Sequence, residues 1–149
     1  MKKFYFLIVT VCLILSGCET THSSLYYWGG VSNNTTTYED MAYGVYKKQS
    51  PEALCRLICV YEDMVKHPNG VRNVPPPGIC AEYAYYLSMP ETAETFARTA
   101  TNKQKRIFEQ SDYAAFFPQY ARELFEREIT LYPESTVFIK PLIDKLLKQ

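Results

Sequence analysis

The sequence predicts an all-α protein with a single folded domain, for three reasons. Apolar residues recur at spacings of three and four over most of the chain after residue 36, as on the buried face of an amphipathic helix. Serine, threonine and proline stand where these helices would begin. No stretch after residue 31 alternates at period two for long enough to form a regular strand. We therefore expect short helices packed as antiparallel hairpins.

The start of the chain has the pattern of a signal peptide. Lys2 and Lys3 make a positive start, and the apolar run from Phe4 to Leu15 is too short to span a bilayer as a helix. The run ends in "LSGC", which resembles the bacterial lipobox, where a cysteine is acylated and the bond before it is cleaved. We expect residues 1–17 to be a lipoprotein signal peptide. The alternatives are a conventionally cleaved secreted protein and an uncleaved signal anchor.

Cys18 would then be the lipidated first residue of the mature protein, and residues 18–24 would form a polar tether to the membrane. Glu19 stands where enteric lipoproteins that stay on the inner membrane carry aspartate, which favours the outer membrane. No acidic cluster that would direct the protein to the cell surface follows Cys18. We expect a periplasm-facing protein on the outer membrane, ahead of the inner membrane or the cell surface.

The composition limits the classes of partner. The 16 basic and 16 acidic residues balance, and removal of Lys2 and Lys3 with the signal peptide would leave a mildly negative protein. This balance argues against electrostatic binding of nucleic acid. Residues 25–149 are enough for one helical, repeat-like domain with a buried core.

Three cysteines would lie in the folded domain: Cys55, Cys59 and Cys80. The periplasm permits disulfides, and either Cys55 or Cys59 could meet Cys80 across a helical hairpin. Cys55 and Cys59 lie four residues apart on one predicted helix, where the geometry is poor for a bond between them. The alternative is that all three are buried and reduced.

The first two helices have clear starts. A capping box, Thr36 with Glu39, precedes the first helix, and Ser50-Pro51 starts the second. A stiff proline-rich connector over residues 68–78 follows the second helix. Five further helical segments are expected: 79–87, 90–100, a short one after Thr101 that carries Ile107 and Phe108, one within 111–133 with Pro118 in its first turn, and 134–148 with an interruption at Pro141.

Three residues match the second helix of a tetratricopeptide repeat. Ala121, Phe125 and Pro133 have spacings of four and eight. In the repeat, the alanine permits close approach of the helices, the aromatic ring fills the groove between them, and the proline ends the helix. The resemblance implies a repeat-like fold in which residues 90–117 are an insertion between the paired helices.

Five stretches of the sequence together resemble one family. They are the lipobox, "LYYWGG", "YEDMAYGVYKK", "VPPPGICAEYAYYL" and "EREITLYPESTVFIKPLIDKLL". The family is the domain of unknown function 4810, whose members are small bacterial lipoproteins, and the similarity covers essentially the whole mature chain. It implies a compact helical lipoprotein with no established activity and no catalytic or cofactor residues. Members are often encoded beside a lipoprotein that resembles the curli secretion component, which implies other envelope lipoproteins as partners.

No set of residues identifies a reaction. His22 lies in the tether and His67 at a helix end, and a metal site of Cys55, Cys59 and His67 would lack a fourth ligand. We therefore predict no catalytic residue, no metal and no cofactor. Neighbouring carboxylates occur three times and are expected on solvated helix surfaces: Glu39-Asp40, Glu62-Asp63 and Glu126/Glu128.

Tyrosine is unusually frequent, with 13 in the chain. Tyr26, Tyr27 and Trp28 are the candidate partner-binding residues, because large rings with a polar group suit interfaces. The alternative is that they dock on the protein's own helices. The leading hypothesis is a non-enzymatic, lipid-anchored scaffold or accessory of an envelope assembly or secretion complex. The second is an envelope enzyme or a lipoprotein that binds a small ligand or peptidoglycan.

Overall fold

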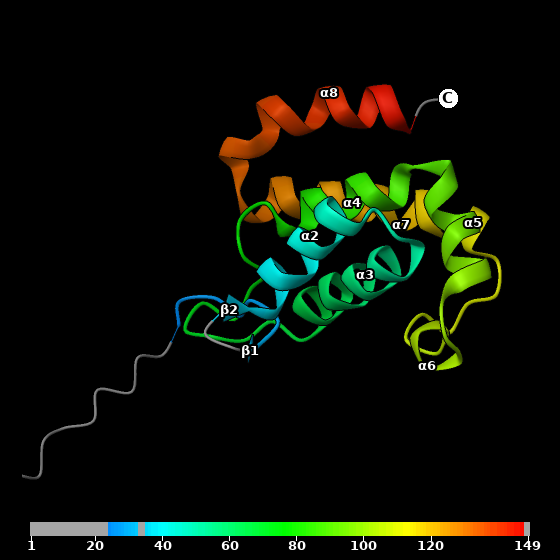
Figure 1. Cartoon of the computed structure of the whole chain (residues 1–149). Helices are drawn as coiled ribbons and strands as arrows, with labels where there is room; N and C mark the ends of the chain where they lie inside the picture. Colours follow the sequence, from blue (N-terminus) through cyan, green and yellow to red (C-terminus); the bar gives the residue numbers. More distant parts are fainter. Residues whose placement is uncertain (1–23, 33–34, 148–149) are drawn as a thin grey trace, which may run out of the picture.

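The computed structural model describes residues 24–32 and 35–147, and the protein is mostly helical, as predicted (Figure 1). The predicted signal peptide and Cys18 lie outside the described residues. The elements in chain order are β1 (Val31–Ser32), β2 (Thr35–Thr36), α2 (Thr37–Lys48), α3 (Pro51–Lys66), α4 (Ile79–Ser88), α5 (Pro90–Thr99), α6 (Asn102–Lys105), α7 (Tyr113–Leu131), the 3-10 helix η1 (Pro133–Ser135) and α8 (Thr136–Leu146). Among the described residues, no helix is both long enough and apolar enough to cross a bilayer.

Local sequence signals set the first helix starts. The Thr36 hydroxyl accepts a hydrogen bond from the Glu39 N–H (3.2 Å), and the Glu39 carboxylate accepts one from the Thr36 N–H (3.1 Å), which confirms the capping box. Ser50 accepts from the Ala53 N–H at 3.2 Å, with Pro51 at the first helical position. Strands β1 and β2 form an antiparallel pair of two residues each, too short to produce a period-two pattern.

Three expected details of the later helices are wrong. Helix α7 begins at Tyr113, so Pro118 lies inside it, and the helix forgoes the bond that an N–H at this position would donate to Ala114. Helix α8 runs through Pro141 without a break. Helix α6 ends at Lys105, and the buried ring of Phe108 therefore comes from the turn that follows.

The core lies where α3, α4 and α7 meet. Helices α4 and α7 make the most extensive contact of any two elements, although α5 and α6 separate them in the chain. Helix α3 packs against α2, α4 and α5. The largest fully buried side chains come mainly from these helices: Tyr61, Tyr83, Phe96, Phe117, Phe125, Leu57, Ile58, Met64, Ile79, Leu87, Leu124 and Glu62.

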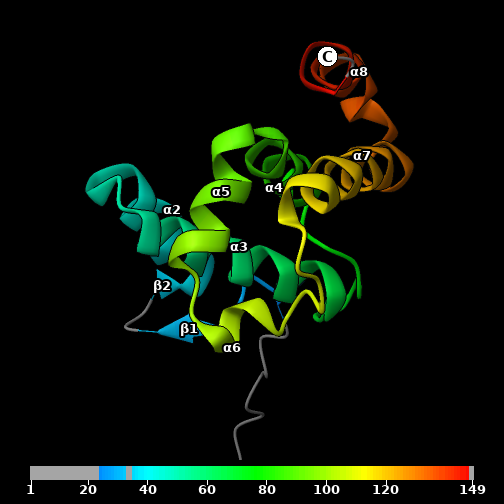
Figure 2. The ribbon, with the colours of Figure 1, turned by 90° about the vertical axis from the view of Figure 1, so that its right-hand side faces the viewer.

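Helix α8 is only loosely covered by the rest of the protein. It packs on α7, and Ile139 is its one buried residue among those described. Figure 2 shows α8 at the top of the molecule, whereas the hairpin β1–β2 and helix α6 lie at the bottom. One side of α4 is accessible, because the side chains of Glu82 and Tyr85 are exposed and those of Ala81 and Tyr86 are half-buried.

Candidate functional site

Three adjoining hollows follow the accessible side of α4, and we refer to them together as the α4 groove. The largest, about 630 Å³, lies between α2, α3, α4 and α5. The other two are about 330 Å³ each, one beside Trp28 and β2 and one between α4 and α8. Tyr86 lines the first and third hollows, and Glu82 lines the second and third. The hollows are therefore parts of one continuous surface.

The part of the groove between α4 and α8 is aromatic and aliphatic with one carboxylate. Tyr85, Tyr86 and Leu142 supply most of its lining, together with Ala81 and Glu82. The Tyr85 side chain is 43% exposed and its ring meets the Tyr86 ring edge-on at 6.1 Å. On α8, Phe138 lies one turn before Leu142 and is 74% exposed. Accessible rings of this kind are typical of protein interfaces.

Two tyrosines hold the carboxylate of Glu82 in place at the groove. The Tyr38 hydroxyl donates a hydrogen bond to Glu82 Oε2 at 2.6 Å, and the Tyr61 hydroxyl donates to the same oxygen at 2.9 Å. Tyr38 lies on α2 and Tyr61 on α3, so this single oxygen links three helices. The groove wall is therefore built around a fixed negative charge.

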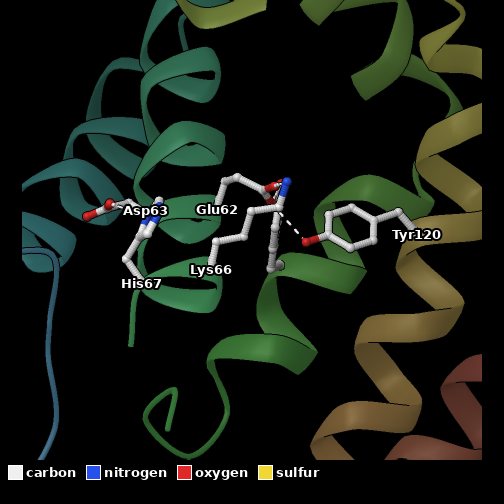
Figure 3. A network of polar contacts seen from close by, with 6 residues as sticks. Glu62, Asp63, Lys66, His67 and Tyr120 are labelled. Atoms are coloured by element: carbon white, nitrogen blue, oxygen red, sulfur yellow. Dashed lines mark hydrogen bonds and ion pairs between the residues drawn. The ribbon is translucent and has the colours of Figure 1, made fainter. Parts of the chain in front are cut away.

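Glu62 forms the counterpart of this arrangement inside the protein, and its prediction as a surface residue is wrong. Its carboxylate is 2% exposed and accepts hydrogen bonds from the hydroxyls of Tyr83 and Tyr120, both at 3.0 Å (Figure 3). Lys66 Nζ lies 2.8 Å from the second carboxylate oxygen. These partners compensate the loss of water that would otherwise make burial of a carboxylate costly.

The tyrosine hydroxyls are held in the donor form. Burial, reinforced by the neighbouring carboxylates, raises the pKa of Tyr61, Tyr83 and Tyr120 well above the ordinary tyrosine value. All three therefore stay protonated at neutral pH and donate to Glu82 and Glu62. The polar groups under the groove form a structural network between helices.

Glu128 is a second carboxylate that we expected on the surface, and this prediction is wrong because the residue is buried. Its neighbour Glu126 is exposed, as predicted. Glu128 is 2% exposed, and its Oε1 accepts a hydrogen bond from the Gly78 N–H at 2.7 Å. Gly78 is the N-cap of α4 and has no side chain to cap the helix, so Glu128 on α7 does so instead. Burial raises the pKa of Glu128, while backbone N–H groups at Gly78, Ala81 and Cys80 oppose that rise.

The aromatic residues beside the tether dock on the protein's own domain. Tyr27 donates a hydrogen bond to Asp63 at 2.9 Å, and Tyr26 accepts one from Arg72 at 2.8 Å. The Trp28 ring lies 5.6 Å from the Tyr38 ring. All three side chains are half-buried, and Trp28 also lines the second hollow of the groove. The expected partner-binding residues and the groove thus meet at Trp28.

The three cysteines of the domain are free thiols in the structure. Cys55 and Cys80 are buried and Cys59 is half-buried. Burial raises the pKa of all three thiols, to about 12 for Cys59 and Cys80, so few thiolates form near neutral pH. His67 pairs with Asp63 at 3.2 Å, and no group of three His, Cys, Asp or Glu residues in the described part of the chain is arranged to hold a metal ion.

Comparisons of the chain with protein-family models, with curated proteins and with solved structures found no match. The site must therefore be interpreted from its geometry. Sequence reasoning missed Tyr85, Tyr86 and Glu82 as a surface. One signal was present, because "EYAYY" places a carboxylate and two tyrosines within one helical turn of each other.

Proposed function

We propose that this protein is a lipid-anchored, non-enzymatic scaffold of the bacterial envelope and that it binds a partner protein in the α4 groove. The observation that carries this proposal is the groove itself. The lining of its first and third hollows is mainly apolar and aromatic, and Leu142, which lines the third, lies one helical turn from the exposed Phe138 ring. Aromatic side chains in accessible hollows are the residues that most often dominate binding between proteins.

The shape and charge of the groove suit an amphipathic segment. Apolar side chains of a partner would fill the hollows on either side of Tyr86, as in recognition of a helix by a groove. Glu82 would face a lysine or arginine of that segment, because its Oε2 is fixed by two tyrosines at the groove wall. This surface supplies both an apolar anchor and a charge that sets orientation.

A tetratricopeptide-like arrangement of helices is part of the proposal. Ala121 and Phe125 are fully buried on α7, and Pro133 follows the end of that helix. The extensive contact between α4 and α7 supports their assignment as the paired helices of one repeat, with α5 and α6 as the insertion. Such pairs commonly present grooves to partners.

The location of the scaffold follows from the start of the chain. The lipobox-like "LSGC" supports acylation at Cys18, and Glu19 supports the outer membrane with the domain facing the periplasm. The resemblance to the domain of unknown function 4810 supports other envelope lipoproteins as partners, including one similar to the curli secretion component.

The buried acids favour a scaffold over an enzyme. Glu62 accepts from two tyrosines and contacts Lys66, and Glu128 caps α4. The three hollows of the groove are lined by neither residue. The two carboxylates with the least access to water therefore have structural partners and do not face a substrate-sized hollow.

Site-specific photo-crosslinking in intact cells tests the proposal. A photoreactive phenylalanine analogue would replace Tyr85 or Phe138 in the groove, and Ile107, 39% exposed beyond α6, in a matched control. We expect a discrete adduct with another envelope protein from the two groove positions, reduced several-fold in a Cys18→Ala background. No adduct from either groove position, or the same adducts from all three positions, would contradict binding in the groove.

A further inference from the structure

The bottom of the molecule in Figures 1 and 2 has the properties of a membrane-contacting surface. In both views the hairpin β1–β2 and helix α6 lie on this side. Helix α8 lies on the opposite side in both views. We call the surface formed by residues 24–32, the loop 68–73 and α6 the lower face.

Exposed aliphatic side chains gather on the first two of these segments. Leu25 is 54% exposed, Val31 is 78% exposed and Val71 is 66% exposed. Leu25 and Val71 are close together, because the N–H groups of Val71 and Arg72 donate to the carbonyls of Ser24 and Leu25, both at 3.1 Å. Exposed aliphatic side chains on loops and turns are suited to insertion among lipid headgroups.

The charge of the lower face complements an anionic surface. Residues 20–38, 64–81 and 95–108 contain no aspartate or glutamate, although the whole chain has 16. The same segments carry exposed cations, of which Arg72 adjoins the aliphatic side chains and Lys103 and Arg106 belong to the α6 region. Asp63, which accepts from Tyr27, and Glu109, which lines the same hollow as Arg106, border these segments. Exposed cations are attracted to anionic phospholipids.

We propose that the lower face lies on the bilayer, with Leu25, Val31 and Val71 at headgroup depth and the cations of the loop and of α6 against anionic phospholipid. The inference rests on the proposed acylation of Cys18. Residues 18–23 can extend at most about 20 Å, so an anchored Cys18 keeps Ser24 and the adjoining Val71 within that distance of the membrane. The short reach of the tether, the exposed aliphatic residues and the exposed cations all favour the same face.

This orientation also determines how the partner site is presented. Helix α8 is on the side opposite the lower face, so Phe138 and Leu142, which belong to α8, would be held far from the bilayer. A partner would thus approach from the aqueous side. The acyl chains and the lower face together would hold the groove at a fixed angle to the membrane.

Quenching of tryptophan fluorescence by brominated lipid tests the orientation on the full acylated chain. The chain has one tryptophan, so Trp28→Phe gives a background into which Leu25→Trp, Val31→Trp or Val71→Trp is introduced. Val137→Trp on α8, where the native side chain is 71% exposed, is the matched control. In vesicles that contain anionic phospholipid, we expect at least about threefold stronger quenching at 31 and 71 than at 137.

The outcomes separate this inference from the proposed function. Mass spectrometry of the same preparation reports whether Cys18 is acylated. An acylated protein with equal quenching at 31, 71 and 137 would overturn the orientation and leave the lipoprotein proposal intact, whereas a non-acylated protein would overturn the anchor itself.

Val31→Asp with Val71→Asp gives a second measurement, because the two charges should lower binding of Cys18→Ala protein to anionic vesicles several-fold. Unchanged binding of that variant would also count against the lower face.

Discussion

Tyr61 and Tyr83 stack with their ring centroids 5.3 Å apart, and each donates a hydrogen bond to the glutamate beside the other in the sequence. Tyr61 precedes Glu62 on α3, and Tyr83 follows Glu82 on α4. The two hydroxyls thus point to opposite sides of the stacked pair, one toward the groove and one toward the core. This exchange links the α4 groove to the packing of α3, α4 and α7.

Glu62→Ala should lower the free energy of unfolding substantially. It leaves the Tyr83 and Tyr120 hydroxyls without their acceptor, at about 1–3 kcal/mol for each stranded group. Lys66 adds little to this loss, because its side chain is 51% exposed and regains water. Urea unfolding of Cys18→Ala protein, followed by circular dichroism, measures the change.

Glu94→Ala is the matched control for Glu62. Glu94 also pairs with a cation four residues away, Arg98, but the two side chains are 75% and 66% exposed. The loss there should be under about 1 kcal/mol. A second check adds Tyr83→Phe and Tyr120→Phe to the Glu62→Ala chain, which should recover part of the stability. Equal effects of Glu62→Ala and Glu94→Ala would show that the buried network does not stabilise the fold.

The free energy of unfolding should fall as the pH rises above about 10. The folded state raises the pKa of Tyr61, Tyr83 and Tyr120, so the folded protein keeps protons that the unfolded chain loses above its ordinary tyrosine pKa of 10.0. The contribution is fully present below that pH and declines above it, by about 1.4 kcal/mol per pH unit for each such tyrosine. Urea unfolding at several pH values above 10 measures this slope. Tyr83→Phe should reduce this slope by about 1.4 kcal/mol per pH unit, the contribution of one tyrosine. An unchanged slope in that variant would show that ionisation of the buried tyrosines does not cause the loss of stability.

Short-range sequence signals predicted the starts of several helices. The burial of Glu62 and Glu128 could not be predicted, because their partners are far away in the sequence. Thr36, Ser50 and Thr101 cap helices through residues three positions away, so their roles could be inferred from spacing alone. Glu62 and Glu128 follow ordinary helix-surface patterns, and their burial depends on groups 21 to 58 residues away. Such partners become neighbours only when the fold is known.

Glu128→Ala should loosen the start of α4, because it removes the carboxylate that accepts from the Gly78 N–H. Loss of a helix cap typically lowers the free energy of unfolding by about 1 kcal/mol, with a range of about 0.5–2 kcal/mol. Faster hydrogen exchange at the first amides of α4 would locate the effect. Glu126→Ala, two residues earlier and exposed, should leave both measurements nearly unchanged. Identical exchange at the start of α4 in both variants would contradict the capping role.

The cysteines should be almost inert in the folded protein. Burial raises the pKa of Cys59 and Cys80 from 9.0 to about 12, which lowers the thiolate fraction near neutral pH about 1,000-fold relative to the unfolded chain. Iodoacetamide labelling, followed by mass spectrometry, should therefore be slow until urea is added. Labelling in urea without reductant should then modify Cys55, Cys59 and Cys80 alike. A pair that stays unlabelled there would reveal a disulfide.

Gly70→Ala should detach the first described residues from the loop after α3. Gly70 has φ of +88°, and an added Cβ would lie 2.8 Å from the Ser24 carbonyl oxygen, which is backbone and cannot rotate away. We expect a loss of about 1–3 kcal/mol and a red shift of Trp28 fluorescence as the segment is released. Gly44→Ala is the opposite control, because Gly44 lies in α2 with nothing within 4 Å of an added Cβ. It should stabilise the protein by about 0.5–1 kcal/mol. If Gly70→Ala is as stable as Gly44→Ala, the contact between the N-terminal segment and the loop does not hold in solution, and the lower face loses its defined shape.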